Sequence, residues 1–340
     1  MKKQTQAYSM TDSSNNTSKA SPPTGGESIS KNIKNNQPNQ VAHNTGSSNR
    51  EFLAKEPIGK LLAKLALPTV AAQMINMLYN IVDRIYIGHI PQNGSLALTG
   101  VGVCMPLIMI ISAFAALVGN GGAPRATIYM GKNKKDDAEK ILGNCFTMQI
   151  ILSVILTAVL LIWNRDLLLA FGASKNTINY ATSYMNIYAI GTIFVQLTLG
   201  MNAFITAQGF AKEGMLSVLI GAIANIILDP IFIFALHMGV KGAALATIIS
   251  QGCSCIWVLS FLFGKRTTLR IRVKNLGLQA SYTLPCLALG SAVFIMQGSE
   301  SIISVCFNSS LLKYGGDMAV GAMTILTSVM QFAMLPLQGL

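Results

Sequence analysis

Long apolar runs alternate with short polar segments along the chain beyond residue 55. A helix that crosses the apolar core of a bilayer needs about 20 predominantly apolar residues, and eight segments meet that requirement. They are expected near 59–88, 96–121, 138–163, 176–207, 214–236, 241–263, 281–311 and 318–340. The pattern therefore predicts an all-α polytopic membrane protein.

The polar positions inside the first predicted span follow a helical repeat. Gln73, Asn76, Asn80 and Asp83 are separated by three, four and three residues, which places them on one face of a helix, and Tyr79 lies beside them. Because lipid offers no hydrogen-bond partners, this face must line a cavity or contact other helices.

The fifth predicted span contains a second polar cluster. Asn225 and Asp229 are four residues apart and share a face, and Pro230 lacks the N–H that would bond the carbonyl of Ile226. Oxygen clusters of this kind coordinate Na⁺ or hold a proton in transporter helices. A purely structural role is disfavoured, because interhelical polar bonds contribute about 0.6 kcal/mol on average, whereas inserting a charge costs about 2.5 to 3.5 kcal/mol.

Composition separates the N-terminal segment from the rest of the chain. The whole sequence is 51% hydrophobic and 11% charged, far from the roughly 25% charged residues of soluble domains. Residues 1–54 are instead rich in Ser, Asn, Gln, Pro and Gly, which predicts a disordered tail. No apolar stretch of a cleaved signal peptide follows Lys2 and Lys3, so we expect the tail to stay in the cytoplasm.

Basic residues in the loops predict the orientation. One set of alternate loops holds eleven of them, and the other set holds only Arg165, Lys175, Lys241 and Lys313. The positive-inside rule then places the first set in the cytoplasm of a multi-pass cell-membrane protein. The eleven are Arg125, Lys132, Lys134, Lys135, Lys140, Lys212, Lys265, Arg266, Arg270, Arg272 and Lys274.

A weak internal repeat predicts two similar lobes. "KLALPTVAAQ" opens the first span and "SYTLPCLALG" opens the seventh; Gly102 follows Pro68 by 34 residues, and Gly321 follows Pro285 by 36. Six-helix repeats are typical of transporters built from two halves. We therefore expect a six-helix lobe at 55–264, a basic loop at 265–280 and, at 281–340, the first two helices of a second lobe that is cut short.

Other functions find little support. The net charge of +12 is explained by topology rather than by nucleic acid. The six cysteines lack zinc spacing, and the three histidines form no H-E-x-x-H. "VGNGGAP" at 118–124 lacks the lysine of a phosphate loop, so we expect a helix to end there. We predict no enzyme activity, no cofactor and no metal site beyond a possible Na⁺ site. Arg84 is expected to pair locally or to reach the membrane surface.

Several stretches together resemble the multidrug and toxic compound extrusion (MATE) family, in particular its DinF-like and archaeal-type branch. The resemblance covers the chain from about residue 55 to its end. The matching stretches are "LALPTV", "YNIVDRIYIG", "PRATIYMGKNKKDDAEKILGN", "MNAFITAQGFAKEGM", "ANIILDPIFIF", "MGVKGAALATIISQ" and "LLKYGGDMAVGAMTIL".

This resemblance implies a twelve-helix exporter with two lobes around a central cavity, and it assigns roles to particular residues. The family's cation site in the N-terminal lobe falls on Asp83, Asn225, Asp229 and Thr247, the last one turn after Ala243. The bend of the family's first helix falls on Pro68, and Pro230 is the second expected irregularity. The residues expected to line the substrate cavity are Asn76, Tyr79, Asn202 and Gln251.

The sequence and the resemblance together predict an antiporter. It would export drugs and other amphipathic or organic cations, coupled to H⁺ or Na⁺ entry, as a monomer in the lipid bilayer. The alternatives are a flippase for lipid-linked saccharides from the same superfamily, and a fragment that does not transport.

Overall fold

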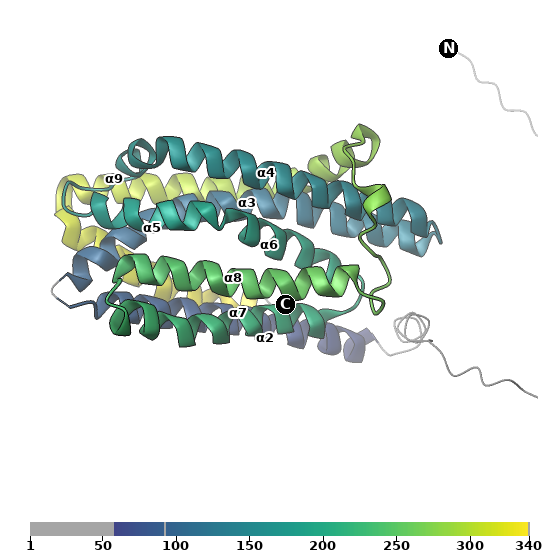
Figure 1. The fold of residues 1–340 in the computed structure, drawn as a ribbon, viewed down its shortest axis with the longest axis horizontal. Helices are drawn as coiled ribbons and strands as arrows, with labels where there is room; N and C mark the ends of the chain where they lie inside the picture. The colour runs from purple at the N-terminus through teal and green to yellow at the C-terminus, as the bar shows by residue number, and fades with distance from the viewer. Residues whose placement is uncertain (1–57, 92, 339–340) are drawn as a thin grey trace, which may run out of the picture. The chain divides into compact units, whose positions relative to one another are not determined.

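The apolar segments form long helices. The computed structural model describes residues 58–91 and 93–338, and every regular element in these ranges is helical (Figure 1). The prediction of an all-α fold is therefore confirmed for this part of the chain. The elements are α2 (Ile58–Gly88), α3 (Gly94–Gly131), α4 (Lys135–Ala170), α5 (Ile178–Ile190), α6 (Thr192–Ala207), α7 (Ala211–Pro230), the π-helix η1 (Ile231–Ala235), α8 (Val240–Phe263), the 3₁₀ turn η2 (Val273–Asn275) and α9 (Ala280–Gln338).

The eight predicted spans correspond to α2, α3, α4, the pair α5–α6, α7 with η1, α8 and the two parts of α9. Within the described ranges, five helices are long and apolar enough to cross a membrane, or six when the bent pair α5–α6 counts as one span. The predicted tail, 1–54, lies outside the described residues. The proposed division into two lobes stays a prediction, because all described helices belong to one compact unit.

One predicted span is broken at a glycine, and the break predicted between the last two spans also lies at a glycine. The span expected at 176–207 is broken at Gly191, where α5 and α6 meet at 59°. A Cβ at Gly191 would lie 2.5 Å from a side-chain carbon of Ile248, so the break lets α8 approach closely. Similarly, α9 changes direction at Gly316, whose φ of 65° is left-handed and suits glycine.

The glycine-rich stretch 118–124 does not end a helix, which corrects our expectation. α3 runs through it to Gly131. A Cβ at Gly119 would lie 2.7 Å from the carbonyl oxygen of Gly200 in α6, and one at Gly122 would lie 2.5 Å from Cys145 Sγ in α4. The glycines therefore allow neighbouring helices to pack closely against α3, as small residues do in membrane proteins.

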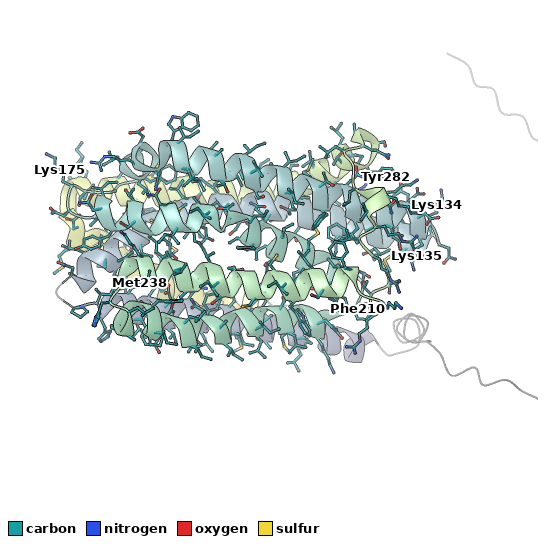
Figure 2. The ribbon with its side chains drawn as sticks, in the orientation of Figure 1. Lys134, Lys135, Lys175, Phe210, Met238 and Tyr282 are labelled. Carbon is teal, nitrogen blue, oxygen red and sulfur yellow. The ribbon has the colours of Figure 1, made fainter. Side chains whose placement is uncertain are left out.

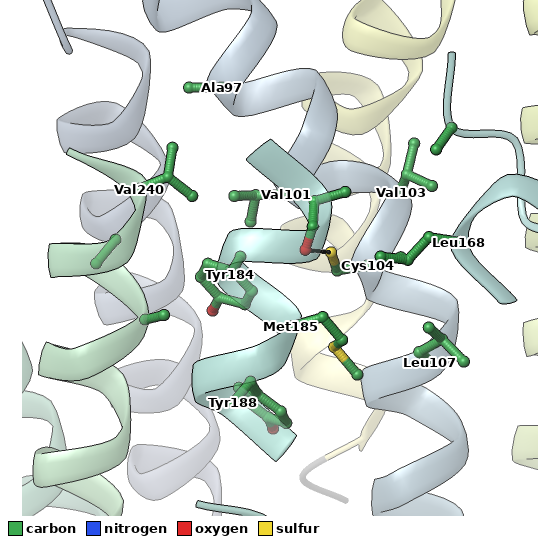
Figure 3. Close-up of a cluster of buried hydrophobic side chains, with 14 of the residues drawn as sticks. Ala97, Val101, Val103, Cys104, Leu107, Leu168, Tyr184, Met185, Tyr188 and Val240 are labelled. Atoms are coloured by element: carbon green, nitrogen blue, oxygen red, sulfur yellow. Dashed lines mark hydrogen bonds between the residues drawn. The ribbon is translucent and has the colours of Figure 1, made fainter. Parts of the chain in front are cut away.

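The helices form two groups that are joined by the bent pair. In Figure 1, α2, α7 and α8 lie together on one side, α3, α4 and α9 lie on the other, and α5–α6 run between them. The broadest helix contact is that of α3 with α9. One core cluster, drawn in Figure 3, includes Val101, Cys104, Tyr184 and Met185, and a second is built around Phe204.

The two ends of the helices differ in charge. We call the end with loops 131–135, 207–211 and 263–280 the basic end, because it holds the eleven basic residues counted in the sequence, and we call the other end the opposite end. Figure 2 shows Lys134, Lys135, Phe210 and Tyr282 at the basic end, and Lys175 and Met238 at the opposite end.

Candidate functional site

A pair of buried carboxyl groups lies between α2 and α7. Asp83 and Asp229 are 7% and 0% exposed, and their carboxyl groups lie close enough to interact electrostatically. Two carboxylates this close cannot both stay negatively charged without a compensating cation. The pair can therefore share a proton or bind a cation.

Asn225 joins the two carboxyl groups as a third polar side chain. It lies one turn before Asp229 on α7. Its Nδ2 donates a 3.2 Å hydrogen bond to Asp229 Oδ1. Asn225 Oδ1, Asp83 Oδ1 and Asp229 Oδ2 are buried and have no hydrogen-bond partner. Such orphaned acceptors are costly unless something binds them, and carboxylate and amide oxygens are the ligands that hard cations prefer.

The chemistry of this cluster suits a proton or a monovalent cation. Within the described ranges, no group of three His, Cys, Asp or Glu side chains could hold a metal ion. With only two carboxyl groups and one amide, the cluster fits H⁺ or Na⁺ better than a tightly held transition metal.

Pro230 lies where α7 changes into a π-helix. α7 ends at Pro230, and in the following turn Leu236 N donates to Ile231 O at 2.9 Å, a bond that spans five residues. Because Pro230 cannot donate to the carbonyl of Ile226, the helix is irregular directly beside Asp229. π turns are frequently found at functional sites.

Thr247 of α8 lies on the same small cavity as Asn225, and Ala243, one turn earlier, is packed in the apolar core. Thr247 Oγ1 donates to the Ala243 carbonyl at 3.0 Å and lies close to Tyr184 of α5. Thr247 and Asn225 line one small cavity of about 50 Å³, enough for one or two water molecules. Asp83, Asn225, Asp229 and Thr247 are thus brought together from three helices.

A larger cavity adjoins the small one. It has a volume of about 790 Å³ and is lined by all four residues expected to contact substrate: Asn76, Tyr79, Asn202 and Gln251. Asn76, Tyr79 and Gln251 also line the small cavity. Asn225 and Thr247 are therefore separated by only the small cavity from the lining of a space large enough for a drug-sized molecule.

The large cavity lies in the half of the bundle toward the basic end. Its lining reaches from Thr69 on α2 and Pro124 on α3 to Ala207 and Ala211, which flank a loop of the basic end. Pro68 is buried beside this lining, and α2 continues through it as a helix.

Contacts between α2, α3 and α9 lie toward the opposite end. Arg84 donates to the Thr324 carbonyl at 3.3 Å and to Ser328 Oγ, both on α9. Beyond the local pairing that the sequence led us to expect, Arg84 therefore also contacts a helix far along the chain. The helices also approach closely, since a Cβ at Gly321 would lie 2.7 Å from Thr99 Oγ1.

Some residues near the site were missed by sequence reasoning. Tyr184 and Tyr188 of α5 stack with ring centroids 6.1 Å apart (Figure 3); Tyr184 contacts Thr247, and Tyr188 lines the large cavity. Their spacing of four residues was a usable signal for a shared face. Gln297 of α9 also lines the large cavity, whereas Glu300 lines a separate cavity of about 420 Å³ with Arg84.

Comparison with known proteins places these features in a family context. A family model described as MatE matches residues 68–231. The chain is 26% identical over 289 residues to the multidrug export protein MepA of Staphylococcus haemolyticus and 23% identical over 291 residues to that of Staphylococcus aureus, covering 85% of this chain and 63% of each relative. The chain thus spans less than two thirds of these relatives.

A solved transporter structure also resembles this chain in fold and sequence. The MATE multidrug transporter DinF-BH is 32% identical to this chain, with a TM-score of 0.79; the match covers 89% of this chain and 66% of the transporter.

Proposed function

The chain belongs to the MATE family of membrane transporters, and from this premise we propose that the full-length protein exports amphipathic and cationic compounds in exchange for H⁺ or Na⁺. The single observation that supports the exchange best is the buried Asp83–Asp229 pair, whose neighbour Asn225 lines the small cavity that shares lining residues with the large one. The multidrug export named for the relatives supports the substrate class.

The lining of the large cavity suits a loosely selective site for organic cations. It combines amide and hydroxyl groups with apolar side chains such as Leu199 and Met215, and its lining residues include no Lys or Arg. Methionine and aromatic side chains adapt to ligands of different shape. A flippase for lipid-linked saccharides would need basic groups for the phosphates, so this alternative is disfavoured.

In the proposed cycle, each residue of the cluster has a distinct task. Asp83 and Asp229 take up the incoming cation, Asn225 orients the Asp229 carboxyl group through its 3.2 Å hydrogen bond, and Thr247 adds a hydroxyl oxygen. Neutralising the pair lets α2 bend near Pro68 and shrink the cavity, which displaces the exported compound. The coupling ion can shift this equilibrium only because it binds one state better than the other.

The arrangement of cavity and contacts corresponds to an inward-facing state if the basic end is cytoplasmic, as the positive-inside rule predicts. The large cavity then lies toward the cytoplasm, and the contacts of Arg84 and Gly321 with their neighbours join α2, α3 and α9 toward the outer end. Export requires these outer contacts to open.

Drug resistance conferred by the full-length protein tests the proposal. Asp229→Asn and Asp83→Asn each remove one exchangeable charge from the pair and should lower efflux of a cationic dye at least about tenfold, which is the effect of about 1.4 kcal/mol. Membrane levels should not change. The matched control is Asp136→Asn at the exposed basic end, which should transport normally. Undiminished efflux by both variants would refute the proposal.

A further inference from the structure

The segment that joins α8 to α9, residues 264–279, forms a strap along the basic end. It contains five basic residues, Lys265, Arg266, Arg270, Arg272 and Lys274, and no acidic residue. Sequence reasoning treated it only as a loop that sets the orientation. The structure gives this strap a defined inner and outer side.

The first half of the strap is fastened through one glutamine. Gln208 Oε1 accepts hydrogen bonds from Thr267 Oγ1 at 2.9 Å and from Leu269 N at 2.7 Å. Thr267, Leu269 and Ile271 are buried. The residues between them, Thr268 and Arg270, are less buried, so alternate residues of this half face the helices.

The second half of the strap is fastened to α4. Arg272 Nε pairs with Glu139 Oε2 at 2.8 Å, and the Glu139 side chain is only 1% exposed. Farther along, Gln279 N donates to Asn144 Oδ1 at 2.6 Å. The position of the strap is therefore determined by hydrogen bonds at both halves rather than by chain connectivity alone.

The outer side of the strap combines positive charge with exposed apolar side chains. Lys265, Arg266 and Lys274 are exposed, and Val273 and Leu278 beside them are 79% and 53% exposed. Exposed lysines of the α3–α4 loop extend this basic surface, as Lys134 and Lys135 in Figure 2 show.

This combination is poorly suited to water and well suited to the membrane surface. In water, an apolar side chain as exposed as Val273 forgoes the favourable free energy of burial. At the boundary between headgroups and acyl chains the same side chain would be buried in lipid. Basic side chains beside a membrane attract anionic headgroups. The positive-inside rule accounts for the sign of the charge but not for an ordered strap with apolar residues between the basic ones.

We propose that the strap is a docking surface for anionic phospholipids of the adjacent leaflet. Lys265, Arg266 and Lys274 contact the headgroup phosphates, while Val273 and Leu278 enter the acyl boundary. The ion pair of Arg272 with Glu139 does not bind lipid but holds the strap in place. This inference concerns the membrane partner and does not depend on the exported compound or on the coupling ion.

Native mass spectrometry of the full-length protein tests the proposal. The detergent-purified protein is titrated with phosphatidylglycerol or phosphatidylcholine, and the bound lipids are counted. A strap variant with Lys265→Gln, Arg266→Gln and Lys274→Gln is compared with a control variant with Lys175→Gln, Lys241→Gln and Lys313→Gln. Both variants lose three exposed positive charges, but at different ends.

We expect the strap variant to bind phosphatidylglycerol at least about tenfold more weakly, with phosphatidylcholine binding unchanged and the control variant close to wild type. Equal losses in both variants would show a general charge effect and overturn the proposal. Undiminished phosphatidylglycerol binding by the strap variant would overturn it as well. Loss of a dimer instead of lipid would overturn it by showing that a second copy covers the strap.

Discussion

The Asp83 and Asp229 carboxyl groups define the site at the scale of single residues. Three buried oxygens of Asp83, Asn225 and Asp229 lack partners, and each such acceptor is costly to leave unsatisfied, at about 1 to 3 kcal/mol. Binding a proton or Na⁺ removes part of this cost. The same unsatisfied groups that destabilise the empty cluster would therefore provide the affinity for the coupling ion.

Thr247 tests the contribution of α8 to this cluster. Thr247→Val keeps the shape of the side chain but removes the hydroxyl that bonds the Ala243 carbonyl and contacts Tyr184. We expect the concentration of coupling ion needed for half-maximal efflux to rise about fivefold or more, corresponding to the roughly 1 kcal/mol of one hydrogen bond. Thr247→Ser, which keeps the hydroxyl, should behave like wild type. A normal ion requirement in Thr247→Val would remove Thr247 from the site.

At the scale of helices, the close approach of α3 and α6 supports one wall of the large cavity. Gly119 lies against the Gly200 carbonyl, and its neighbour Asn120 lines the cavity together with Ala203 of α6. Backbone contact of this kind leaves no room for a side chain. The shape of the cavity therefore depends on glycine at this position.

Two glycine substitutions with opposite expected effects test this packing. Gly119→Ala places a Cβ 2.7 Å from the Gly200 carbonyl oxygen and should cost about 1 to 3 kcal/mol, the usual cost of overpacking. Gly252→Ala meets no atom closer than 4.0 Å and should be neutral or stabilising by up to about 1 kcal/mol, because alanine favours a helix. Thermal unfolding in detergent measures both. Equal melting temperatures for the two variants would contradict the described packing.

The sequence was sufficient to predict the spans but not the way in which they bend and meet. Apolar length identifies α3, α4 and α8 directly, whereas nothing local distinguishes Gly191, where a helix breaks, from Gly119, where one continues. The two glycines differ in the helix that packs against them. Gly191 meets the Ile248 side chain of α8, whereas Gly119 meets the backbone of Gly200 in α6.

The candidate site was predictable only in part from residue spacing. Spacing placed Asn225 and Asp229 on one face, but only the family resemblance suggested that Asp83 and Thr247 meet them. The bonds of Arg84 with α9 were missed because its partners there, Thr324 and Ser328, are 240 and 244 residues away in the sequence. Contacts of this range depend on how helices pack, which periodicity does not reveal.

At the scale of the whole molecule, transport requires the opposite end to open. The contact of α3 with α9 reaches this end, and Thr99 and Gly321 face each other there. Cavities on alternate sides of the membrane are the basis of transport by two-lobed carriers. A covalent cross-link that holds α3 to α9 at this point should therefore stop the transport cycle.

A reversible cross-link tests this requirement. A Cβ at Gly321 would lie 3.9 Å from Thr99 Cβ, which is within the range for a disulfide. The double variant Thr99→Cys and Gly321→Cys in the full-length protein should lose most dye efflux on oxidation and regain it on reduction. Each single variant serves as a control. Full efflux by cross-linked protein would show that this contact does not open during transport.

The most direct test of cation-coupled export is dye efflux from proteoliposomes that contain the full-length protein, with Na⁺ and pH gradients imposed separately. We expect one of the two gradients to drive efflux by the wild type, and Asp229→Asn to lose this driven component while still binding the dye. Efflux driven equally well in wild type and Asp229→Asn, or efflux indifferent to both gradients, would contradict the proposed coupling.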